Sequence, residues 1–182
     1  MASKLKGKDW YKIVAPKFFG DFVIGETISM DPKNLINRVV EASLMDITGD
    51  TSKYYIILFF KVKEVQDNKA ITKFFGHNCT RDFIARIVQK RTTRIDTNDI
   101  INLKDEKMRV KSIVISNRRV SRTLKTEIRK LVREKIINEL SKMKTEEFVK
   151  EMIDGKIQSK IKKEVSKTYP IRFFEFRKTQ VL

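Results

Sequence analysis

The sequence predicts an α+β protein, with an antiparallel β-barrel-like body flanked by helices, an extended basic N-terminal arm and a long basic helix. Apolar and polar residues alternate through most of residues 35–116, which is typical of strands. Residues 117–143 carry the longest helical spacing of apolar residues in the chain. Residues 1–20 are basic and have no clear period. We therefore expect an extended basic arm over 1–20 and a single α+β domain over 21–182.

The strands of this body are expected to be short and joined by polar turns. They are placed at 39–45, 54–65, 70–75, 94–103, 108–116 and 171–177. Asp67-Asn68 supplies turn residues between the second and third of these strands, which predicts a hairpin. Strands with this spacing favour an antiparallel sheet that curls toward a barrel.

Shorter helices are predicted beside the long one. Thr80 is a suitable N-cap for a helix over 80–89, and Asp82 lies in its first turn. Thr145 begins another helix, which Gly155 ends. A last helix follows over 157–165, before Pro170.

The long helix has two kinds of face. Apolar residues recur at three- and four-residue spacing, and so do basic residues on another face, namely Arg122, Lys125, Arg129 and Arg133. Past Lys135 the apolar stripe moves roughly a quarter-turn around the axis, to Ile136, Leu140 and Met143. We expect the two halves of this helix to pack on different neighbours, or the helix to bend between them. A row of guanidinium groups suits a polyphosphate partner.

The charge balance points to a polyanionic partner. The 182 residues include 40 Lys and Arg against 23 Asp and Glu, a formal net charge of +17. Nucleic acid is the obvious polyanion. A membrane surface is the weaker alternative, because the basic residues are spread over loops and several helices rather than one lipid-facing helix.

The compartment is predicted to be the cytoplasm. The chain has a single Cys, no apolar run long enough to span a bilayer, and no apolar signal-peptide core at its N-terminus.

Catalytic and metal-binding patterns are not found, so we expect no enzyme, no catalytic residue, no cofactor and no metal site. The sequence has no Walker loop, dinucleotide fingerprint or nucleophile elbow. His77 and Cys79 are two residues apart without a second cluster, whereas a structural zinc site needs four ligands. Asp96 and Asp99 lie three apart in a predicted strand and should point to opposite faces.

Two basic junctions are candidate binding sites, and the one with Arg118, Arg119 and Arg122 is the sharper of the two. Residues 90–94 follow a helix, and we favour phosphate contact for Arg91 and Arg94, while Lys90 is equally well explained as a solvated helix end. The second junction carries Arg118, Arg119 and Arg122, which we also favour as a binding site. The alternative is an ion pair with Glu127, which could neutralise only one of the three.

The N-terminal lysines are expected to touch RNA with little specificity. Trp10 either docks on the core, which we favour, or stacks on bases. The full set of candidate RNA-binding residues is Lys4, Lys6, Lys8, Trp10, Tyr11, Lys12, Lys17, Arg81, Arg91, Arg94, Arg118, Arg119, Arg122, Lys125, Arg129 and Arg133.

The distribution of charge favours RNA over DNA. No helix-turn-helix, zinc-finger or basic-zipper pattern is present. Basic residues on several faces suit a protein embedded among folded RNA segments better than one that reads a single groove.

Several motifs together resemble one family. They are Lys8-Asp9-Trp10-Tyr11 with Ala15-Pro16, Cys79-Thr80-Arg81-Asp82, Arg91-Thr92-Thr93-Arg94-Ile95-Asp96, Ile128-Arg129-Lys130, and Tyr169-Pro170-Ile171-Arg172 with Arg177-Lys178. They resemble, in order and over nearly the whole chain, the S-three-A-e family of archaeal and eukaryotic small-subunit ribosomal proteins, in its archaeal form.

The resemblance implies a structural constituent of the small ribosomal subunit, on the platform near the mRNA exit. Its expected partners are small-subunit ribosomal RNA near the 3′ end and neighbouring platform proteins, with no membrane, no DNA and no homo-oligomer. The alternatives are an RNA-processing enzyme and an RNA chaperone that works off the ribosome.

Overall fold

The computed structural model describes residues 7–182 and forms two compact units that divide between Gly76 and His77. Each unit combines strands with helices, so the α+β class is confirmed. Strand β5 runs across the division, and its last residues, His77 to Cys79, belong to the second unit. The two units are described separately below.

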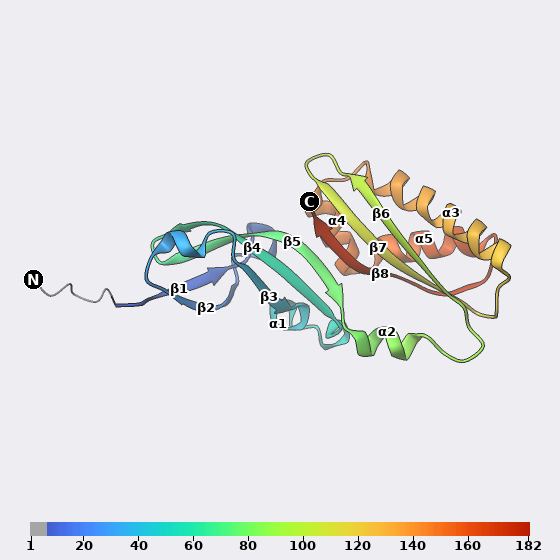
Figure 1. Ribbon diagram of the computed structural model, residues 1–182, viewed down its shortest axis with the longest axis horizontal. Helices are drawn as coiled ribbons and strands as arrows, with labels where there is room; N and C mark the ends of the chain where they lie inside the picture. Colours follow the sequence, from blue (N-terminus) through green and yellow to red (C-terminus); the bar gives the residue numbers. More distant parts are fainter. Residues whose placement is uncertain (1–6) are drawn as a thin grey trace, which may run out of the picture. The chain divides into compact units, whose positions relative to one another are not determined.

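The first unit is a five-stranded sheet with short helical turns (Figure 1). Its elements are β1 (Asp9–Val14), η1 (Lys17–Phe19), β2 (Val23–Ser29), η2 (Pro32–Leu35), β3 (Val39–Ser43), α1 (Leu44–Thr48), η3 (Thr51–Lys53), β4 (Ile56–Gln66) and β5 (Lys69–Cys79). Strand β1 pairs antiparallel with β2 and parallel with β5, and β4 pairs with β3 and β5. Ile13, Val62 and Ala70 pack together in the core of this unit.

The extended basic arm expected over 1–20 is not confirmed for the described residues. Residues 9–14 form β1 inside the sheet, because Tyr11 and Ile13 alternate inward and are each 3% exposed. The preceding residues 1–6, with the candidates Lys4 and Lys6, lie outside the described residues. The part of the arm that the structure describes is therefore a strand paired on both sides, followed by the short helical turn η1.

The β4–β5 hairpin closes as its turn residues predict. Asp67 and Asn68 both adopt positive φ, 45° and 59°, which matches the twist of a two-residue turn. Helix α1 was not expected, because Leu44 and Met45 were assigned to the preceding strand. Ser43 ends that strand instead, and its hydroxyl accepts a hydrogen bond from the Met45 amide as an N-cap.

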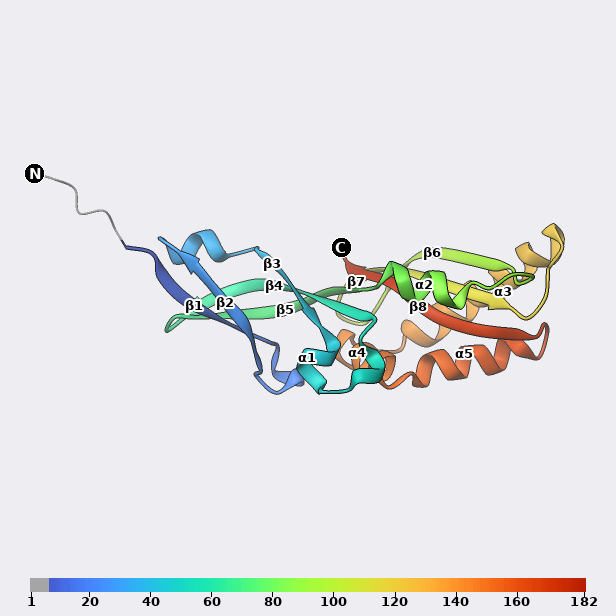
Figure 2. The ribbon, with the colours of Figure 1, turned by 90° about the horizontal axis from the view of Figure 1, so that it is seen from below.

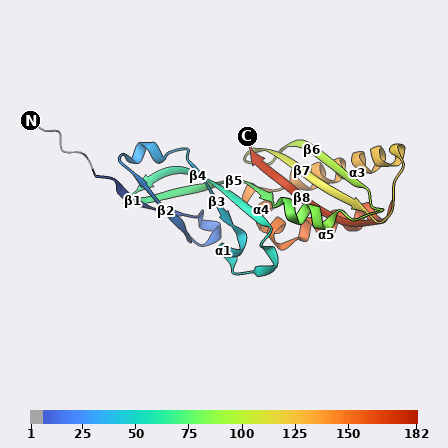
Figure 3. The ribbon, with the colours of Figure 1, turned by 60° about the horizontal axis from the view of Figure 1, so that its bottom comes forward.

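The second unit is a sheet with helices. After the end of β5 it contains α2 (Arg81–Ile87), β6 (Arg94–Asn102), β7 (Lys107–Ser116), α3 (Arg122–Leu140), α4 (Thr145–Asp154), α5 (Lys156–Ser166) and β8 (Ile171–Val181). Strand β7 lies between β6 and β8 and is antiparallel to both. Helices α4 and α5 cover one face, α3 packs along β6, and α2 runs beside β8 (Figures 1, 2 and 3).

The strand pattern of this unit follows the sequence closely. Every second residue of β6 from Ile95 to Ile101 is buried and the residues between are exposed. Asp96 is accordingly exposed and Asp99 buried, so their expected opposite orientation is confirmed. Strand β8 is longer than expected, because it continues past Arg177 to Val181.

The barrel-like body is not confirmed. Within residues 7–76 the strand order is β2-β1-β5-β4-β3, and β2 and β3 are its edge strands. In the second unit the order ends at β6. Among the described residues, therefore, the strands of neither unit close into a barrel.

Candidate nucleic-acid interface

Two basic sites lie in the second unit, and the first is a cluster of loop arginines. Arg91, Arg118 and Arg119 line a pocket of about 550 Å³ with Asn117, where the loop before β6 meets the loop after β7. We call these three arginines the loop cluster. The two basic junctions singled out in the sequence thus meet at one place, although 27 positions separate Arg91 from Arg118.

The loop cluster is held in place by hydrogen bonds between Thr93 and Ser116. The Ser116 amide donates to the Thr93 carbonyl at 3.0 Å, and the Thr93 amide donates to the Ser116 hydroxyl at 3.0 Å. The Val120 amide donates to the Thr93 hydroxyl at 3.0 Å. Arg91 adopts φ +66°, a conformation uncommon for a residue with a side chain. The hydrogen bonds of Thr93 and Ser116 hold the two loops against each other and so fix the spacing of the arginines.

No carboxylate neutralises the loop cluster within residues 7–182. Its three arginines are exposed and form no ion pair there, and Arg122 does not pair with Glu127. The alternative of a local pair with Glu127 is therefore not seen. Three unneutralised guanidiniums held close together repel one another and attract oxyanions.

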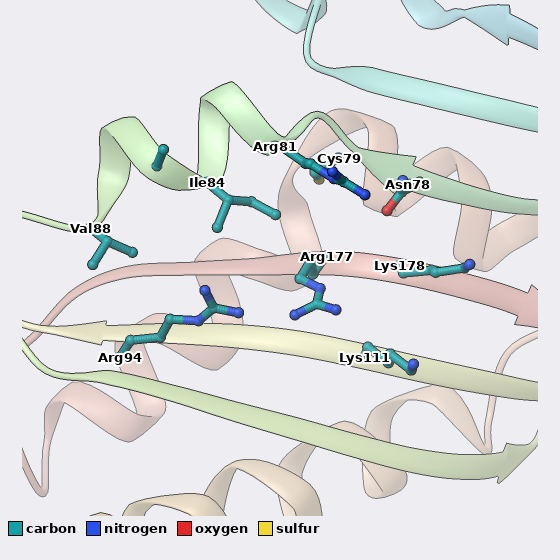
Figure 4. Close-up of a pocket in the computed structure, with 10 residues that line it drawn as sticks. Asn78, Cys79, Arg81, Ile84, Val88, Arg94, Lys111, Arg177 and Lys178 are labelled. Carbon is teal, nitrogen blue, oxygen red and sulfur yellow. The ribbon is translucent and has the colours of Figure 1, made fainter.

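The second site is a groove between α2 and the strands. It has a volume of about 710 Å³ and is lined by Asn78, Cys79, Arg81, Ile84, Ala85, Val88, Arg94, Lys111, Arg177 and Lys178 (Figure 4). We call it the basic groove. Two of its cations, Arg81 and Arg94, were candidate RNA-binding residues in the sequence. Lys111, Arg177 and Lys178 were not candidates, although Arg177-Lys178 belongs to a family motif.

A bulge in β8 explains why two consecutive basic residues reach the basic groove. Lys111 of β7 pairs with Lys178, and the next residue, Ser112, pairs with Phe176, which leaves Arg177 as an extra residue. Arg177 and Lys178 are both partly exposed, unlike the alternation of a regular strand. The dipeptide Arg177-Lys178 after alternating phenylalanines was the available signal for this bulge, and the periodicity alone could not place it.

Asp96 makes the ionic contacts beside the groove. Its carboxylate accepts two hydrogen bonds from Arg94, with Nε–Oδ2 and Nη2–Oδ1 distances of 2.9 Å, and lies 3.8 Å from Arg177. Asp96 also lines an adjoining pocket of about 270 Å³ with Thr97, Asn98, Lys111 and Arg177. One carboxylate therefore faces two guanidiniums at the edge of the groove.

Two buried groups near the groove, His77 and Cys79, are neutral. Burial lowers the pKa of His77 from 6.5 to about 4 and raises the pKa of the Cys79 thiol. His77 Nε2 lies 2.9 Å from the Phe176 carbonyl oxygen, and the Cys79 thiol donates to the same oxygen. These groups serve the packing of β5 on β8 and add no charge to the site.

The arginine side chains of α3 contact the rest of this unit more than the sequence suggests. Arg129 Nε donates to the Asp96 carbonyl oxygen at 3.1 Å, and Arg133 Nε donates to the Asp99 carboxylate at 2.5 Å. Arg122 is exposed and Lys125 half-buried at the N-terminal end of the helix. The four basic residues therefore fall into two pairs. Arg129 and Arg133 contact β6, whereas Arg122 and Lys125 lie at the N-terminal end of the helix, which follows the loop of the loop cluster.

In the first unit, β1 presents only some of its candidate residues. Trp10 is 65% exposed, so the favoured expectation that it docks on the core is wrong within the described residues. Tyr11 is buried, and its ring is not available for stacking. Lys8, Lys12 and Lys17 are exposed.

Two other kinds of feature were sought in the described chain, metal-ligand groups and membrane-spanning helices. Among residues 7–182 no group of three His, Cys, Asp or Glu side chains is placed to hold a metal ion. None of the helices described has the length and apolar character needed to cross a membrane.

Comparison with known proteins defines the class. The whole chain, residues 1–182, matches the Ribosomal S3Ae family. The chain is thus a ribosomal protein, a structural component of the cytoplasmic ribosome and not an enzyme. It belongs to the Ribosomal S3Ae family, and the resemblance found in the sequence is confirmed.

Archaeal relatives match over nearly the full length. A protein of Sulfurisphaera tokodaii named small ribosomal subunit protein eS1 is 38% identical over 98% of this chain and 93% of its own length. Proteins of the same name from Desulfurococcus amylolyticus and Saccharolobus islandicus are 37% and 34% identical over 98% of this chain, and the matches cover 84% and 86% of their lengths.

Proposed function

We propose that this protein is a structural constituent of the small ribosomal subunit that binds ribosomal RNA through its phosphates. On this proposal it lies on the platform near the mRNA exit, as a single copy beside the 3′ region of the RNA and neighbouring platform proteins. The observation that carries the proposal is the loop cluster, whose three arginines have no acidic partner among residues 7–182. The name of the relatives supports the subunit assignment.

The loop cluster suits phosphate rather than base recognition. Arginine forks match phosphate oxygens, and contacts of this kind fix the position of a protein on RNA without reading sequence. The net charge of +17 favours association with an external polyanion. Exposed Trp10, with Lys8 and Lys12 on the same segment, supplies a second candidate surface, where a base could stack on the indole.

The triple variant Arg118→Ala, Arg119→Ala and Arg122→Ala tests the proposal. It removes two arginines of the loop cluster and the exposed Arg122 at the start of α3. We expect its affinity for the 3′ domain of small-subunit RNA to fall about tenfold or more, because three exposed charge contacts are lost. The thermal midpoint should change little, since all three side chains are exposed. Filter binding and incorporation into reconstituted small subunits are the measurements.

A charge-matched control distinguishes the effect of losing the site from the effect of lowering the net charge. Lys104, Lys142 and Lys150 are also exposed, and replacing all three by Ala removes the same charge elsewhere in the same unit. Equal loss of affinity in both triple variants would contradict a specific loop cluster. Failure of the wild-type protein to co-sediment with small subunits would instead favour an RNA chaperone that works off the ribosome.

A further inference from the structure

The basic groove has two chemically different walls. On the strand side, Arg94, Lys111 and Arg177 point into the space in front of β6, β7 and β8 (Figure 4). On the other side, Ile84 of α2 and Val88, which follows the helix, project toward β8 (Figure 4). Ala85 of α2 is exposed between them in sequence and also lines the groove. A cationic wall opposite an apolar wall suits a ligand that is itself half anionic and half apolar.

The cationic wall already holds one oxyanion. The Asp96 carboxylate binds Arg94 through two hydrogen bonds and lies within 3.8 Å of Arg177, so the two guanidiniums can share one anionic group. Lys111 and Lys178 face each other across the β7–β8 pair and form no ion pair among the described residues. Two lysines thus remain to bind an incoming anion beside the two guanidiniums that Asp96 orients.

The apolar wall is not explained by phosphate binding. Helix α2 has no buried residue, and Ile84 and Val88 are only half-buried. A phosphate would leave this surface in water, whereas the flat face of a nucleobase would cover it. Asn78, at one end of the groove, carries an amide that can both donate to and accept from a base edge. The volume of about 710 Å³ lies within the range of small-ligand pockets.

We propose that the basic groove receives one unpaired nucleotide of RNA, with its phosphate on Arg177, Lys111 and Lys178 and its base against Ile84 and Val88. The proposal rests on the proposed function and adds to it a site for a single-stranded, unstacked nucleotide, which the loop cluster does not provide. Because a base inside a duplex cannot enter such a groove, the site discriminates single-stranded from double-stranded RNA.

Substitution at Ala85 tests this without removing any basic residue. Ala85→Glu and Ala85→Lys both place a long side chain in the groove, and both residues are good helix formers. We expect each variant to bind a single-stranded decamer of uridine about fivefold more weakly, the lower end of the cost of losing one base contact. The affinity for a ten-base-pair duplex should follow only the change of charge, so the ratio of the two affinities is the measured quantity.

A matched position controls for charge. Asn138 is exposed on α3, and Asn138→Glu and Asn138→Lys make the same charge differences outside the groove. These variants should leave the single-strand to duplex ratio unchanged. If Ala85→Lys binds the decamer as tightly as wild type or more tightly, the cations only follow the RNA backbone along the rim, and the proposal is overturned.

Photo-crosslinking locates the base. A decamer that contains 4-thiouridine should crosslink to the α2 peptide that includes Ile84 and Val88, and the crosslink should be lost in Ala85→Glu. Crosslinks confined to residues 117–122 would overturn the groove proposal and leave phosphate binding by the loop cluster intact. Absence of RNA binding by the wild-type protein would instead reject the proposed function itself.

Discussion

The single histidine of the chain is a neutral, buried link between β5 and β8. His77 Nε2 lies 2.9 Å from the Phe176 carbonyl, which can only accept, so the proton is on Nε2. Nδ1 therefore accepts from the Thr179 hydroxyl, at 2.6 Å, while that hydroxyl accepts from the His77 amide. Both ring nitrogens are hydrogen-bonded in the neutral form, and burial, which penalises the charged form, lowers the pKa to about 4.

This histidine predicts an acid-sensitive stability. Between pH 6.5 and about 4 the unfolded chain binds a proton that the folded chain does not, so the free energy of unfolding falls as the pH is lowered through this window. The slope reaches about 1.4 kcal/mol per pH unit, and the total loss is about 3 kcal/mol near pH 4. Urea unfolding at a series of pH values measures it. In His77→Gln the dependence between pH 5 and 6.5 should disappear, and an unchanged slope in that variant would contradict the assignment.

Among site residues, the sequence predicted the loop cluster better than the basic groove. Arg91, Arg118 and Arg119 lie in polar loops at element ends, where local composition is enough to single them out. Lys111 and Arg177 lie inside strands with buried neighbours, where a basic residue on the solvent face has no distinctive signal. Only the register of β7 against β8 brings them together.

Helix α3 combines two packing surfaces, as the drift of its apolar stripe predicts. Its buried residues Ile128, Val132, Ile136 and Leu140 follow a four-residue spacing, which rotates slowly around the axis. The helix packs on β6 and on α5, and the second contact includes ion pairs of Lys135 with Glu164 and of Lys160 with Glu139, at 2.9 and 2.7 Å. The expectation that its two halves face different neighbours agrees with these contacts.

The ion pair between α3 and β6 should contribute to stability rather than to RNA binding. The Asp99 side chain is 4% exposed, and Arg133→Ala leaves its buried carboxylate without its cation. We expect Arg133→Ala to lower the free energy of unfolding by about 2 kcal/mol, the cost of an unsatisfied charged group at a partly exposed site. Chemical denaturation measures it, with Lys130→Ala, an exposed position on the same helix, as the near-neutral control.

A second variant distinguishes the buried charge from lost packing. Asp99→Asn combined with Arg133→Ala removes the charge together with its partner, so the double variant should be more stable than Arg133→Ala alone. A double variant that is less stable than either single variant would show that Asp99 is held by other interactions.

Strands and helices with strong local patterns were predictable, and those decided by pairing were not. The alternation in β6 and the cap signals around α4 placed both elements within two residues. Strand β1 was missed because Trp10 and Tyr11 in a basic segment look like an extended arm, and only pairing with β2 and β5 makes it a strand. Barrel closure likewise depends on which edges meet, which periodicity does not encode.

For the whole molecule, the excess of positive charge sets the salt dependence of RNA binding. Each neutralised phosphate contributes about −0.9 to the slope of log affinity against log salt for a duplex and about −0.7 for a single strand. With contacts on several faces we expect a steep slope, and the triple variant of Arg118, Arg119 and Arg122 should reduce it by roughly two to three. A salt series by filter binding measures both slopes. A flat dependence in the wild type would contradict binding led by phosphates.

The hydrogen bond from Arg129 to β6 has a consequence for the protein before it joins a ribosome. Strand β6 is an edge strand in the second unit, and an unpaired edge of this kind can template pairing with another chain. Arg129 donates to the Asp96 carbonyl, and α3 packs along the same strand. We therefore expect α3 to hinder pairing between β6 and another copy of the chain before the protein has bound RNA.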